Sequence, residues 1–420
     1  MHFSLVGVNH RTAPIAIREK ASIRVGKLHE SLSLLRAYVP QGIILSTCNR
    51  AEVYTTGSDS HFSEEASLNF LKVHLDIPET DLLQYAYVAE GEAAAEHLFR
   101  IACGLDSMIV GEFEVLGQVK HALDTAEKTR MANLQLRHIF QSVIRTGRRV
   151  REETGISKNA LSVSSVAVDL AARVVGGLEN CKMMVIGSGE AGRLVAKAAR
   201  YRGVSQIFVV SRTPERASTL AAMLGGIPVS PNNLVEKLST CNIVVTCAAA
   251  PHWVLNVRQV AAAMRNRPEF PLMIIDIAVP RNVEPAVEQI NNVFLHNIDG
   301  LTQISALNRK QREDEIQRAV EIIAAEVANF VTWWRALEVR PVVSALMTKA
   351  ENIRSAQLNK TLKKLRPLSE EERDSLEAMT KSIVTKILRD PVQYLKTKVN
   401  GNDYAKMVSK LFHLNGEKRG

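Results

Sequence analysis

The stretch of sequence that decides the fold of the middle of the chain is KMMVIGSGEAG, residues 182–192. Its first five residues form a short, mainly apolar run that indicates a buried strand, and the next six fit the pattern G-x-G-x-x-G. A helical run over 190–201 and a second strand-like run over 206–210 follow. This order of strand, glycine loop, helix and strand is the context that a dinucleotide-binding site requires. The alternative is a glycine-rich turn in an α/β domain that binds no cofactor.

Each glycine of this loop has a separate task in such a site. Gly187 permits the tight turn, Gly189 lets the backbone approach a pyrophosphate, and Gly192 lets the helix pack closely on the strand. At the end of the second strand, where an NAD site usually has an acidic residue, the sequence is Ser211-Arg212-Thr213. Arg212 can pair with a 2′-phosphate, so the sequence favours NADPH over NADH, unless Arg212 is only a solvated loop residue. The predicted cofactor contacts are Gly187, Ser188, Gly189, Glu190, Ala191, Gly192, Ser211 and Arg212.

The chain has 420 residues, enough for two or three domains, and its character changes twice along its length. Residues 1–155 mix strand-like runs (3–8 and 42–45) with helical ones (93–103 and 134–152), and residues 156–300 alternate strands and helices. Residues 301–420 look wholly helical, with breaks or bends at Pro341 and at 366–369. We therefore predict an α/β multidomain protein with an α+β N-terminal catalytic domain, a Rossmann-type doubly wound nucleotide domain, and a long helix that leads into an all-α C-terminal domain.

Composition narrows the class of protein further. The chain is 46% hydrophobic and 23% charged, as is ordinary for a globular protein. No apolar run approaches the roughly 18 residues of a membrane-spanning helix, and the N-terminus lacks the features of a signal peptide. The five cysteines are odd in number and form no C-x-x-C pair, which argues against a disulfide framework or a zinc site. The sequence therefore predicts a cytoplasmic protein without a metal centre.

The net charge of +9 is concentrated near the C-terminus. Residues 340–420 contain 17 Lys and Arg against 9 Asp and Glu, a surplus of +8. This asymmetry indicates a polyanionic partner, or alternatively a solvated helical surface with no partner. The candidate contacts are Lys360, Lys363, Lys364, Arg366, Lys381 and Lys386, and a rival set is Arg145, Arg148, Arg149 and Arg151.

Cys48 is the candidate for the chemistry of the chain. It follows a strand-like run that ends at Ser46, and Arg50 stands two residues further on. A thiol at a strand end with a cation nearby is expected to favour the nucleophilic thiolate, whereas most lone cysteines are small buried hydrophobic residues. A nucleophilic thiol in one domain and a hydride donor in another suggest that an activated carboxyl group is captured as a thioester and then reduced to an aldehyde.

Six stretches, spread in order over nearly the whole chain, carry a family resemblance. They are GVNHRTAP (7–14), LSTCNR (45–50), GLDSMIVGE (104–112), LGQVK (116–120), GSGEAG (187–192) and DIAVPR (276–281). Together they resemble the glutamyl-tRNA reductase family, which opens tetrapyrrole synthesis from glutamate. The resemblance implies NADPH-dependent reduction of glutamyl-tRNA(Glu) to glutamate-1-semialdehyde with release of tRNA, through a Cys48 thioester, as the first step of 5-aminolevulinate and porphyrin synthesis. It also implies a V-shaped homodimer joined by the C-terminal helices, and a partnership with glutamate-1-semialdehyde aminomutase.

The same resemblance implies the roles of individual residues. Cys48 matches the nucleophile, and His97 matches the active-site histidine, a general acid or orienting group, although a lone histidine on a partly apolar helix is more often structural. Arg50 is expected to grip a carboxylate by two parallel hydrogen bonds. Phe113 and Glu114 depart from the family's usual Gly-Glu-Pro-Gln pattern. The residues that match the glutamyl pocket are Thr47, Cys48, Asn49, Arg50, Ser107, Glu112, Phe113, Glu114 and Gln118.

An apolar stripe in the last third of the chain has the spacing of a helix seam. Its members, at alternating intervals of four and three, are Ile316, Val320, Ile323, Val327, Phe330, Trp334 and Leu337. The pattern predicts either a dimer interface or one long helix that packs on its own chain.

Three functions are consistent with the residues: the reductase, an NADP-dependent dehydrogenase of a free small molecule with a structural Cys48, and a non-catalytic nucleotide-binding or RNA-binding protein. A thioester route requires the thiol, whereas simple hydride transfer does not. The presence of both the thiol loop and the glycine loop argues against the third.

Overall fold

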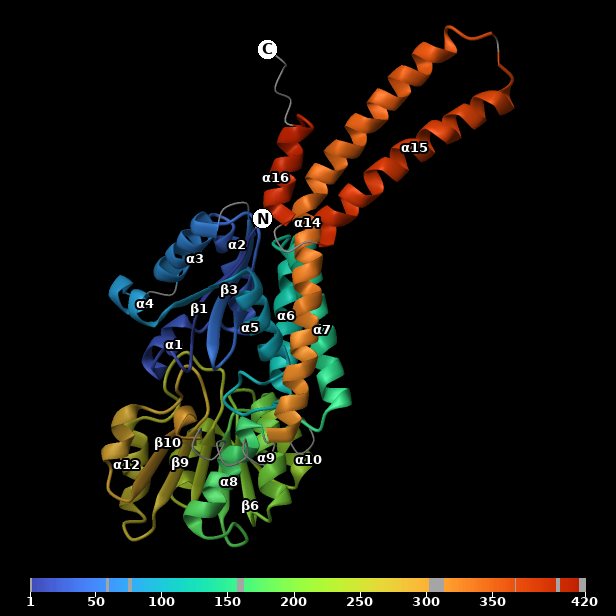
Figure 1. Cartoon of the computed structure of the whole chain (residues 1–420). Helices are drawn as coiled ribbons and strands as arrows, with labels where there is room; N and C mark the ends of the chain where they lie inside the picture. Colours follow the sequence, from blue (N-terminus) through green and yellow to red (C-terminus); the bar gives the residue numbers. More distant parts are fainter. Residues whose placement is uncertain are drawn as a thin grey trace. The chain divides into compact units, whose positions relative to one another are not determined.

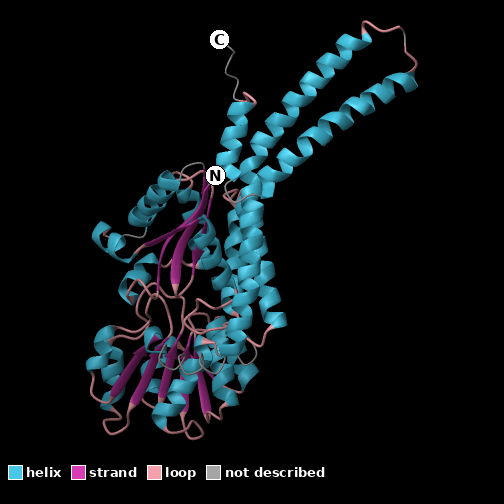
Figure 2. Cartoon of the chain, in the orientation of Figure 1, coloured by secondary structure: helices cyan, strands magenta, loops and turns pink. Residues whose placement is uncertain are grey.

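The computed structural model describes residues 2–57, 60–74, 78–156, 162–301, 313–366, 368–397 and 401–414. The chain divides into two compact units, Met1–Ala324 and Ala325–Gly420, and the division falls inside helix α14 (Glu313–Leu362) (Figure 1). Figure 2 shows that the strands of the first unit form two separate sheets. We call residues 2–156 the thiol domain and residues 162–301 the nucleotide domain. The predicted domain limits of 1–155, 156–300 and 301–420 remain predictions.

Four antiparallel strands in the order β2-β3-β1-β4 form the sheet of the thiol domain. They are β1 (His2–Asn9), β2 (Gly42–Ser46), β3 (Arg50–Gly57) and β4 (Tyr87–Glu90). The runs predicted at 3–8 and 42–45 are thus confirmed as strands. Nearly every residue of β1 and β3 is buried, because helices cover the central strands.

The helices of the thiol domain pack on this sheet, with α3 and α5 against β1, α6 against β2 and α7 against β3. Those predicted at 93–103 and 134–152 are confirmed as α5 and α7. Helix α7 begins where the side chain of Asn133 accepts a hydrogen bond from the backbone of Leu136 at 2.8 Å, a standard N-cap. The elements are α1 (Ile15–Ala21), η1 (Val25–Lys27), α2 (Leu28–Leu35), α3 (Ser60–His74), α4 (Glu79–Tyr85), α5 (Gly91–Ala102), α6 (Glu114–Lys128) and α7 (Leu134–Glu153).

Six parallel strands in the order β10-β9-β8-β5-β6-β7 form the sheet of the nucleotide domain. The chain builds outward from β5 in one direction, then returns to the other side of β5 with β8. This reversal is the switch point of a doubly wound sheet, where nucleotides bind at the carboxyl ends of the strands. The strands are β5 (Lys182–Ile186), β6 (Gln206–Val210), β7 (Ile227–Val229), β8 (Ile243–Thr246), β9 (Leu272–Asp276) and β10 (Val293–Asn297).

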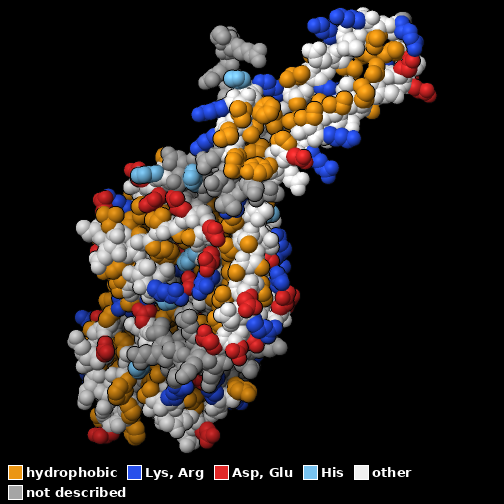
Figure 3. Space-filling model, in the orientation of Figure 1, with side chains coloured by type: hydrophobic (Ala, Val, Ile, Leu, Met, Phe, Trp, Pro, Cys, Tyr) orange, Lys and Arg blue, Asp and Glu red, His pale blue; other side chains and the backbone are white. Residues whose placement is uncertain are grey.

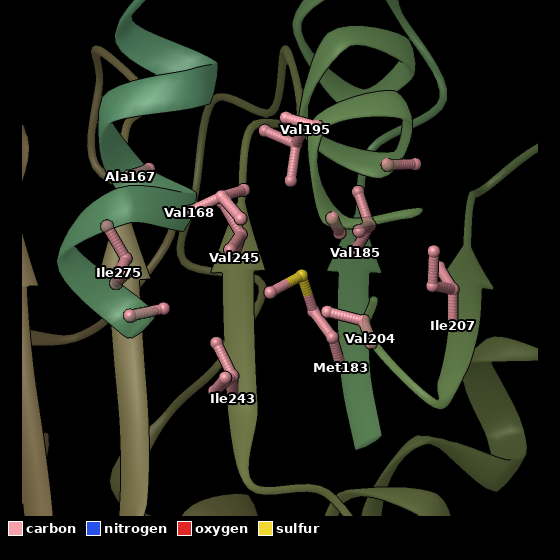
Figure 4. Close-up of a cluster of buried hydrophobic side chains, with 14 of the residues drawn as sticks. Ala167, Val168, Met183, Val185, Val195, Val204, Ile207, Ile243, Val245 and Ile275 are labelled. Carbon is pink, nitrogen blue, oxygen red and sulfur yellow. The ribbon is translucent and has the colours of Figure 1, made fainter. Parts of the chain in front are cut away.

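Apolar cores lie on both faces of this parallel sheet. Figure 4 shows one of them, in which Val168 of α8 and Val195 of α9 lie over Met183 and Val245 of the strands. The other core joins the opposite faces of the strands to α11 and α12. The strand and helix predicted around the glycine loop are therefore confirmed. The elements are α8 (Val163–Val175), α9 (Glu190–Tyr201), α10 (Pro214–Leu224), η2 (Pro231–Asn233), α11 (Leu234–Leu238), α12 (Val257–Arg265), η3 (Pro285–Gln289) and η4 (Ile298–Leu301).

The second unit is helical and contains the later part of α14, then α15 (Glu370–Thr397) and α16 (Gly401–Leu411). Helix α14 continues through Pro341, so this proline does not end a helix. Proline has no backbone N–H and so removes one hydrogen bond of the helix. The hydrogen bonds of the long helical segments on both sides of Pro341 keep the helix continuous. The break predicted at 366–369 is confirmed between α14 and α15, although Pro367 itself lies outside the described residues.

The apolar stripe of α14 is already buried in the single chain. Ile316, Ile323, Val327, Phe330 and Trp334 are buried, and Val320 and Leu337 are half-buried. Ile316 and Ile323 lie in the first unit and are covered within it, which favours the alternative that this part of the helix packs on its own chain.

Other apolar side chains of the second unit are exposed. Figure 3 shows hydrophobic side chains gathered along these helices. The large exposed ones are Met347, Ile353, Leu365, Met379, Ile383, Ile387, Tyr394, Met407, Leu411 and Phe412. In the part of the chain that the structure describes, no helix combines the length and apolar character needed to span a membrane.

Candidate functional site

Cys48 lies in the short loop that joins β2 to β3, at the end of a strand as predicted. Two hydrogen bonds close this loop: the backbone N–H of Thr47 donates to the carbonyl of Arg50 at 2.8 Å, and the N–H of Asn49 donates to Thr47 Oγ1 at 3.1 Å. The side chain of Cys48 is half-buried. The loop therefore holds the thiol in one place at the edge of the sheet.

The electrostatics of the thiol differ from the expectation that Arg50 favours the thiolate. Burial, followed by the carboxyls of Glu112 and Glu114, raises the pKa of Cys48 to about 12, and Arg18 opposes this shift. Arg50 does not act as the activating cation, because its guanidinium is occupied by Glu52. At neutral pH the residue is a thiol, so a nucleophilic role requires a base that removes its proton.

Arg50 is buried and bonded to protein acceptors. Its Nη1 donates to Glu52 Oε1 at 2.8 Å, and its Nη2 donates to the carbonyl oxygen of Asp106 at 2.5 Å. The guanidinium side chain is 2% exposed. A substrate carboxylate that accepted two hydrogen bonds from Arg50 would have to displace Glu52 and the carbonyl of Asp106. The geometry therefore favours a structural role for Arg50, in which it holds Glu52 and the backbone of Asp106 in place.

Glu52 is the centre of a buried polar network. Its carboxylate accepts hydrogen bonds from Arg50, from Tyr54 Oη at 2.6 Å, from Tyr87 Oη, and from His97 Nε2 at 3.0 Å. Burial disfavours the charged form, but Arg50, His97 and the hydrogen bonds to the carboxylate outweigh burial and hold the pKa of Glu52 far below its usual range. The carboxylate is thus charged, and hydrogen bonds from protein groups replace those that water would make.

Sequence reasoning missed this network, although the sequence contains one signal for it. Glu52 is an acidic residue within a strand-like run, and its register partner on β1 is Gly7. A Cβ at position 7 would lie 2.7 Å from Glu52 Cγ, so only glycine leaves room for the carboxylate chain. The pairing of an acid with a glycine across two buried strands is visible only when the register is known.

His97 projects from α5 with a carboxylate near each ring nitrogen. Its Nε2 lies 3.0 Å from Glu52 Oε1, and its Nδ1 lies 3.4 Å from Asp106 Oδ2. The ring packs edge-on against Tyr87, with 5.5 Å between ring centroids, and 16% of the side chain is exposed. Asp106 also pairs with Arg11 at 2.8 Å. An imidazole held in this way is oriented and can transfer a proton at the surface of the site.

The predicted glutamyl pocket is brought together only in part. Ser107 and Glu112 are buried, and burial, then Glu114, raises the pKa of Glu112 to about 7 against the effects of Ser107, Arg50 and Arg151. Burial, followed by Glu190, also raises the pKa of Glu114. Asn49 is buried, and its Oδ1 has no hydrogen-bond partner among the described residues.

A cavity of about 480 Å³ joins the thiol domain to the glycine loop. Phe113, Glu114 and Gln118 line it together with Glu190, the first residue of α9. Cys48 and His97 are not among its lining residues. Three predicted pocket residues of the thiol domain and one predicted cofactor residue therefore line the same cavity.

The glycine loop fits a dinucleotide. A Cβ at Gly192 would lie 1.9 Å from the carbonyl oxygen of Gly187, so α9 packs on the loop as closely as glycine allows. At Gly189 a Cβ would meet no atom within 4 Å, which leaves the backbone open to a pyrophosphate. The N-terminus of α9 begins there, and its N–H groups suit an anion.

The second loop of the nucleotide domain presents a cation. Ser188 Oγ and Ser211 Oγ lie 2.8 Å apart and tie the ends of β5 and β6 together. Arg212 is exposed, and within the described residues it has no hydrogen bond or ion pair. Its guanidinium is therefore available to a phosphate group at the end of β6.

Comparison with known proteins agrees with this architecture. Residues 6–154 match the model of the glutamyl-tRNAGlu reductase N-terminal domain, residues 169–304 that of shikimate / quinate 5-dehydrogenase, and residues 318–414 that of the glutamyl-tRNAGlu reductase dimerisation domain. The middle match identifies a dehydrogenase domain, a type that works with a nicotinamide cofactor.

Whole-chain relatives extend the agreement. Glutamyl-tRNA reductase of Natranaerobius thermophilus is 36% identical over 99% of this chain and 93% of its own length. That of Moorella thermoacetica is 39% identical over 97% of this chain and 94% of its own length. The solved structure of glutamyl-tRNA reductase from Methanopyrus kandleri is 33% identical, covers 99% of each chain and has a TM-score of 0.52. With relatives that match from end to end, the chain belongs to the glutamyl-tRNA reductase family of oxidoreductases.

Proposed function

We propose that this protein reduces glutamyl-tRNA(Glu) to glutamate-1-semialdehyde with NADPH and releases tRNA, through a thioester on Cys48. In the family this reaction opens 5-aminolevulinate and porphyrin synthesis. The observation that carries the proposal is the cavity that Gln118 and Glu114 of the thiol domain share with Glu190 of the glycine loop. The reaction uses first a thiol and then a hydride donor, so the thiol loop and the glycine loop must lie close to one another.

The first step forms the thioester. Cys48 Sγ bonds to the ester carbonyl carbon as the bond from that carbon to the ribose oxygen of tRNA breaks. The ribose oxygen receives a proton, and His97, oriented by Glu52 and Asp106, is suited to deliver it. Because the pKa of Cys48 is about 12, the thiol proton must pass to a base first.

Glu112 is our candidate for that base. It is the charged group that acts most strongly on the thiol, and its own pKa is about 7. A carboxyl whose pKa lies near the working pH can accept a proton and return it later, and transfer from this thiol is uphill because the pKa of the thiol is higher. NADPH, which the glycine loop and Arg212 would hold, would supply the hydride that reduces the thioester carbonyl to the aldehyde. Cys48 then leaves as the carbon–sulfur bond breaks, and takes back its proton.

The direct test is incubation of the protein with glutamyl-tRNA and NADPH. We expect release of uncharged tRNA, oxidation of one NADPH per tRNA, and an aldehyde that a hydrazine or amine reagent traps. Oxidation of NADPH with free glutamate or another small molecule, and none with glutamyl-tRNA, would instead support a dehydrogenase in which Cys48 is structural.

Replacing Glu112 with Gln should slow thioester formation about a hundredfold, since the amide cannot accept the thiol proton. In the wild type the rate should rise with pH through about 7, as the carboxylate form of Glu112 becomes populated, and the variant should lose that inflection. The measurement is single-turnover release of tRNA without NADPH between pH 5 and 9. Asp124→Asn, which changes a half-buried carboxyl on α6, is the control. An inflection that persists in the Glu112→Gln variant would assign the base elsewhere.

Arg212 should set the choice between NADPH and NADH. A charge-assisted bond to the 2′-phosphate contributes about 1.5–3 kcal/mol, or roughly ten- to a hundredfold in affinity. Arg212→Ala should raise the KM for NADPH by that factor and leave the KM for NADH nearly unchanged. Arg216→Ala, which removes a nearby exposed arginine on α10, is the control. Equal losses with both nucleotides would contradict the assignment.

The second unit is our candidate for the homodimer interface and for part of the tRNA contact. Its exposed apolar side chains support association with a second copy.

Lys363, Arg366 and Arg373 line one surface cavity where α14 ends and α15 begins, which supports contact with a polyanion. Arg366 pairs with Glu372, and in the rival set Arg149 pairs with Glu153, so each set has a member that an acidic neighbour already neutralises. A partnership with glutamate-1-semialdehyde aminomutase stays a prediction, as does the cytoplasmic location.

A further inference from the structure

Two neighbouring residues of helix α1 form ion pairs with residues of the nucleotide domain. Arg18 pairs with Asp299 of η4, and Glu19 pairs with Arg281, which follows β9. The two residues have opposite charges, and so do their partners. Helix α1 itself packs on β1 and β3, the strand that follows the Cys48 loop. These ion pairs therefore connect the core of the thiol domain to the carboxyl edge of the parallel sheet.

Arg18 connects the nucleophile to this contact directly. Its guanidinium, 2% exposed, donates to the carbonyl of Ala13 at 3.2 Å, to the carbonyl of Cys48 at 3.1 Å and to the carboxylate of Asp299. A planar guanidinium with three partners in fixed directions permits little movement of any of them. The backbone of Cys48 and the nucleotide domain thus share one rigid group.

Glu19 makes the second connection with three bonds to one residue. Its carboxylate accepts from the backbone N–H of Arg281 at 2.6 Å, from Nε at 2.8 Å and from Nη2 at 2.8 Å. The loop that carries Arg281 is itself held by the buried Asp276, which accepts from Thr246 Oγ1 at 2.7 Å and from the N–H of Asn282 at 2.7 Å. The anchor is therefore a stiff part of the nucleotide domain beside the strand ends where a cofactor binds.

The chemistry explains why such a connection matters. Under the proposed function, on which this inference rests, the thiol domain alone can form the thioester. Reduction additionally requires the carbonyl carbon to lie about 3–3.5 Å from the hydride donor in the other domain. A thioester that waits for its reductant is open to attack by water, which releases free glutamate instead of the aldehyde.

We infer that Arg18, Glu19, Asp299 and Arg281 form an interdomain clamp that positions the Cys48 loop for hydride transfer, and so directs the thioester to reduction and away from hydrolysis. These are positioning residues, because they act through the Cys48 loop and through the loop after β9. We call this set the α1 clamp.

The test is the double variant Glu19→Gln/Asp299→Asn, which removes the two negative charges of the clamp and keeps the size of both side chains. The measured quantity is the ratio of aldehyde to free glutamate formed from glutamyl-tRNA with saturating NADPH. We expect this ratio to fall at least about tenfold, since a small misplacement of reacting atoms strongly slows reaction. Release of tRNA without NADPH should stay within about twofold of the wild type. After the free glutamate formed without protein is subtracted, the ratio of the two products does not depend on the fraction of protein that is folded.

Asp169→Asn is the matched control. Asp169 pairs with Arg202 at 2.5 Å, and both side chains are about as exposed as those of Glu19 and Arg281, but this pair lies within the nucleotide domain. The product ratio of this variant should equal that of the wild type. An unchanged ratio in the double variant, or an equal fall in the control, would overturn the clamp.

A second measurement separates this inference from the proposed function. Hydrogen exchange of the amides in α1 and η4 should speed up in the double variant and not in Asp169→Asn, whatever the substrate is. If the wild type makes no aldehyde, the proposed function fails, and the exchange rates still decide whether α1 is clamped. Unchanged exchange in both elements would reject the clamp regardless of activity.

Discussion

Cys48→Ser is expected to lower the rate of aldehyde formation by at least about a thousandfold, while the fold and the affinity for NADPH stay unchanged. Thioester chemistry needs sulfur, since an ester on serine is a poorer acceptor of hydride and the hydroxyl is a weaker nucleophile. Glu112, with its pKa of about 7, can draw a proton from a thiol far more readily than from a serine hydroxyl. The two measurements are multiple-turnover oxidation of NADPH and mass spectrometry of the denatured protein after incubation with glutamyl-tRNA alone.

The wild type should carry one glutamyl adduct on Cys48 in the absence of NADPH, and the variant none. Cys181→Ser is the control, because Cys181 is a buried cysteine just before β5, in the nucleotide domain. The control should keep both the adduct and the turnover. Near-normal reduction by Cys48→Ser would refute the thioester route and leave simple hydride transfer as the mechanism.

Glu52→Gln should destabilise the thiol domain by about 3–5 kcal/mol, the usual effect of removing one partner of a buried ion pair. The variant leaves the charge of the buried Arg50 without its carboxylate, and it replaces an acceptor of four hydrogen bonds by a group that also donates. Native-state hydrogen exchange of the amides in β1 and β3 measures this free energy locally. Glu65→Gln, at an exposed position of α3, should change it by less than about 0.5 kcal/mol.

The same carboxylate gives this domain a defined response to acid. The pKa of Glu52 is lowered in the folded state, from 4.5, so its stabilising contribution is complete above that value and is lost as pH falls toward the folded-state pKa. The wild type should therefore lose stability below about pH 4.5 more steeply than Glu52→Gln. Equal acid dependence of the two proteins would mean that Glu52 is not the charged centre of the network.

Local sequence patterns predicted the elements around the glycine loop and the place of Cys48. The strand 206–210 and the helix 190–201 have the bounds expected, because a short apolar run and a glycine turn act over a few residues. Cys48 stands at a strand end for the same reason. Family resemblance along the chain added His97 and the pocket residues, whose roles remain predictions.

Several properties depended on contacts between distant residues. The stripe of α14 was compatible with a partner helix or with its own chain, and only burial in the folded chain distinguishes the two. The sequence predicts Arg50 as the cation that activates Cys48, whereas in the fold its guanidinium donates to Glu52 and to the carbonyl of Asp106. Nothing in the spacing of these residues indicates which acceptor a long, flexible side chain will reach.

The sequence by itself determined the class of fold, the strand, glycine loop and helix of the nucleotide domain, and the position of the thiol, because each of these arises from neighbours along the chain. Only the tertiary structure decided the state of the thiol, the network of Glu52 and the α1 clamp. Desolvation and charge pairing depend on distance in space, and the residues involved are far apart in sequence: Arg18 and Asp299 are separated by 281 positions. Short motifs therefore place the candidate residues along the chain, and contacts between distant residues set the charge and the partners of their side chains.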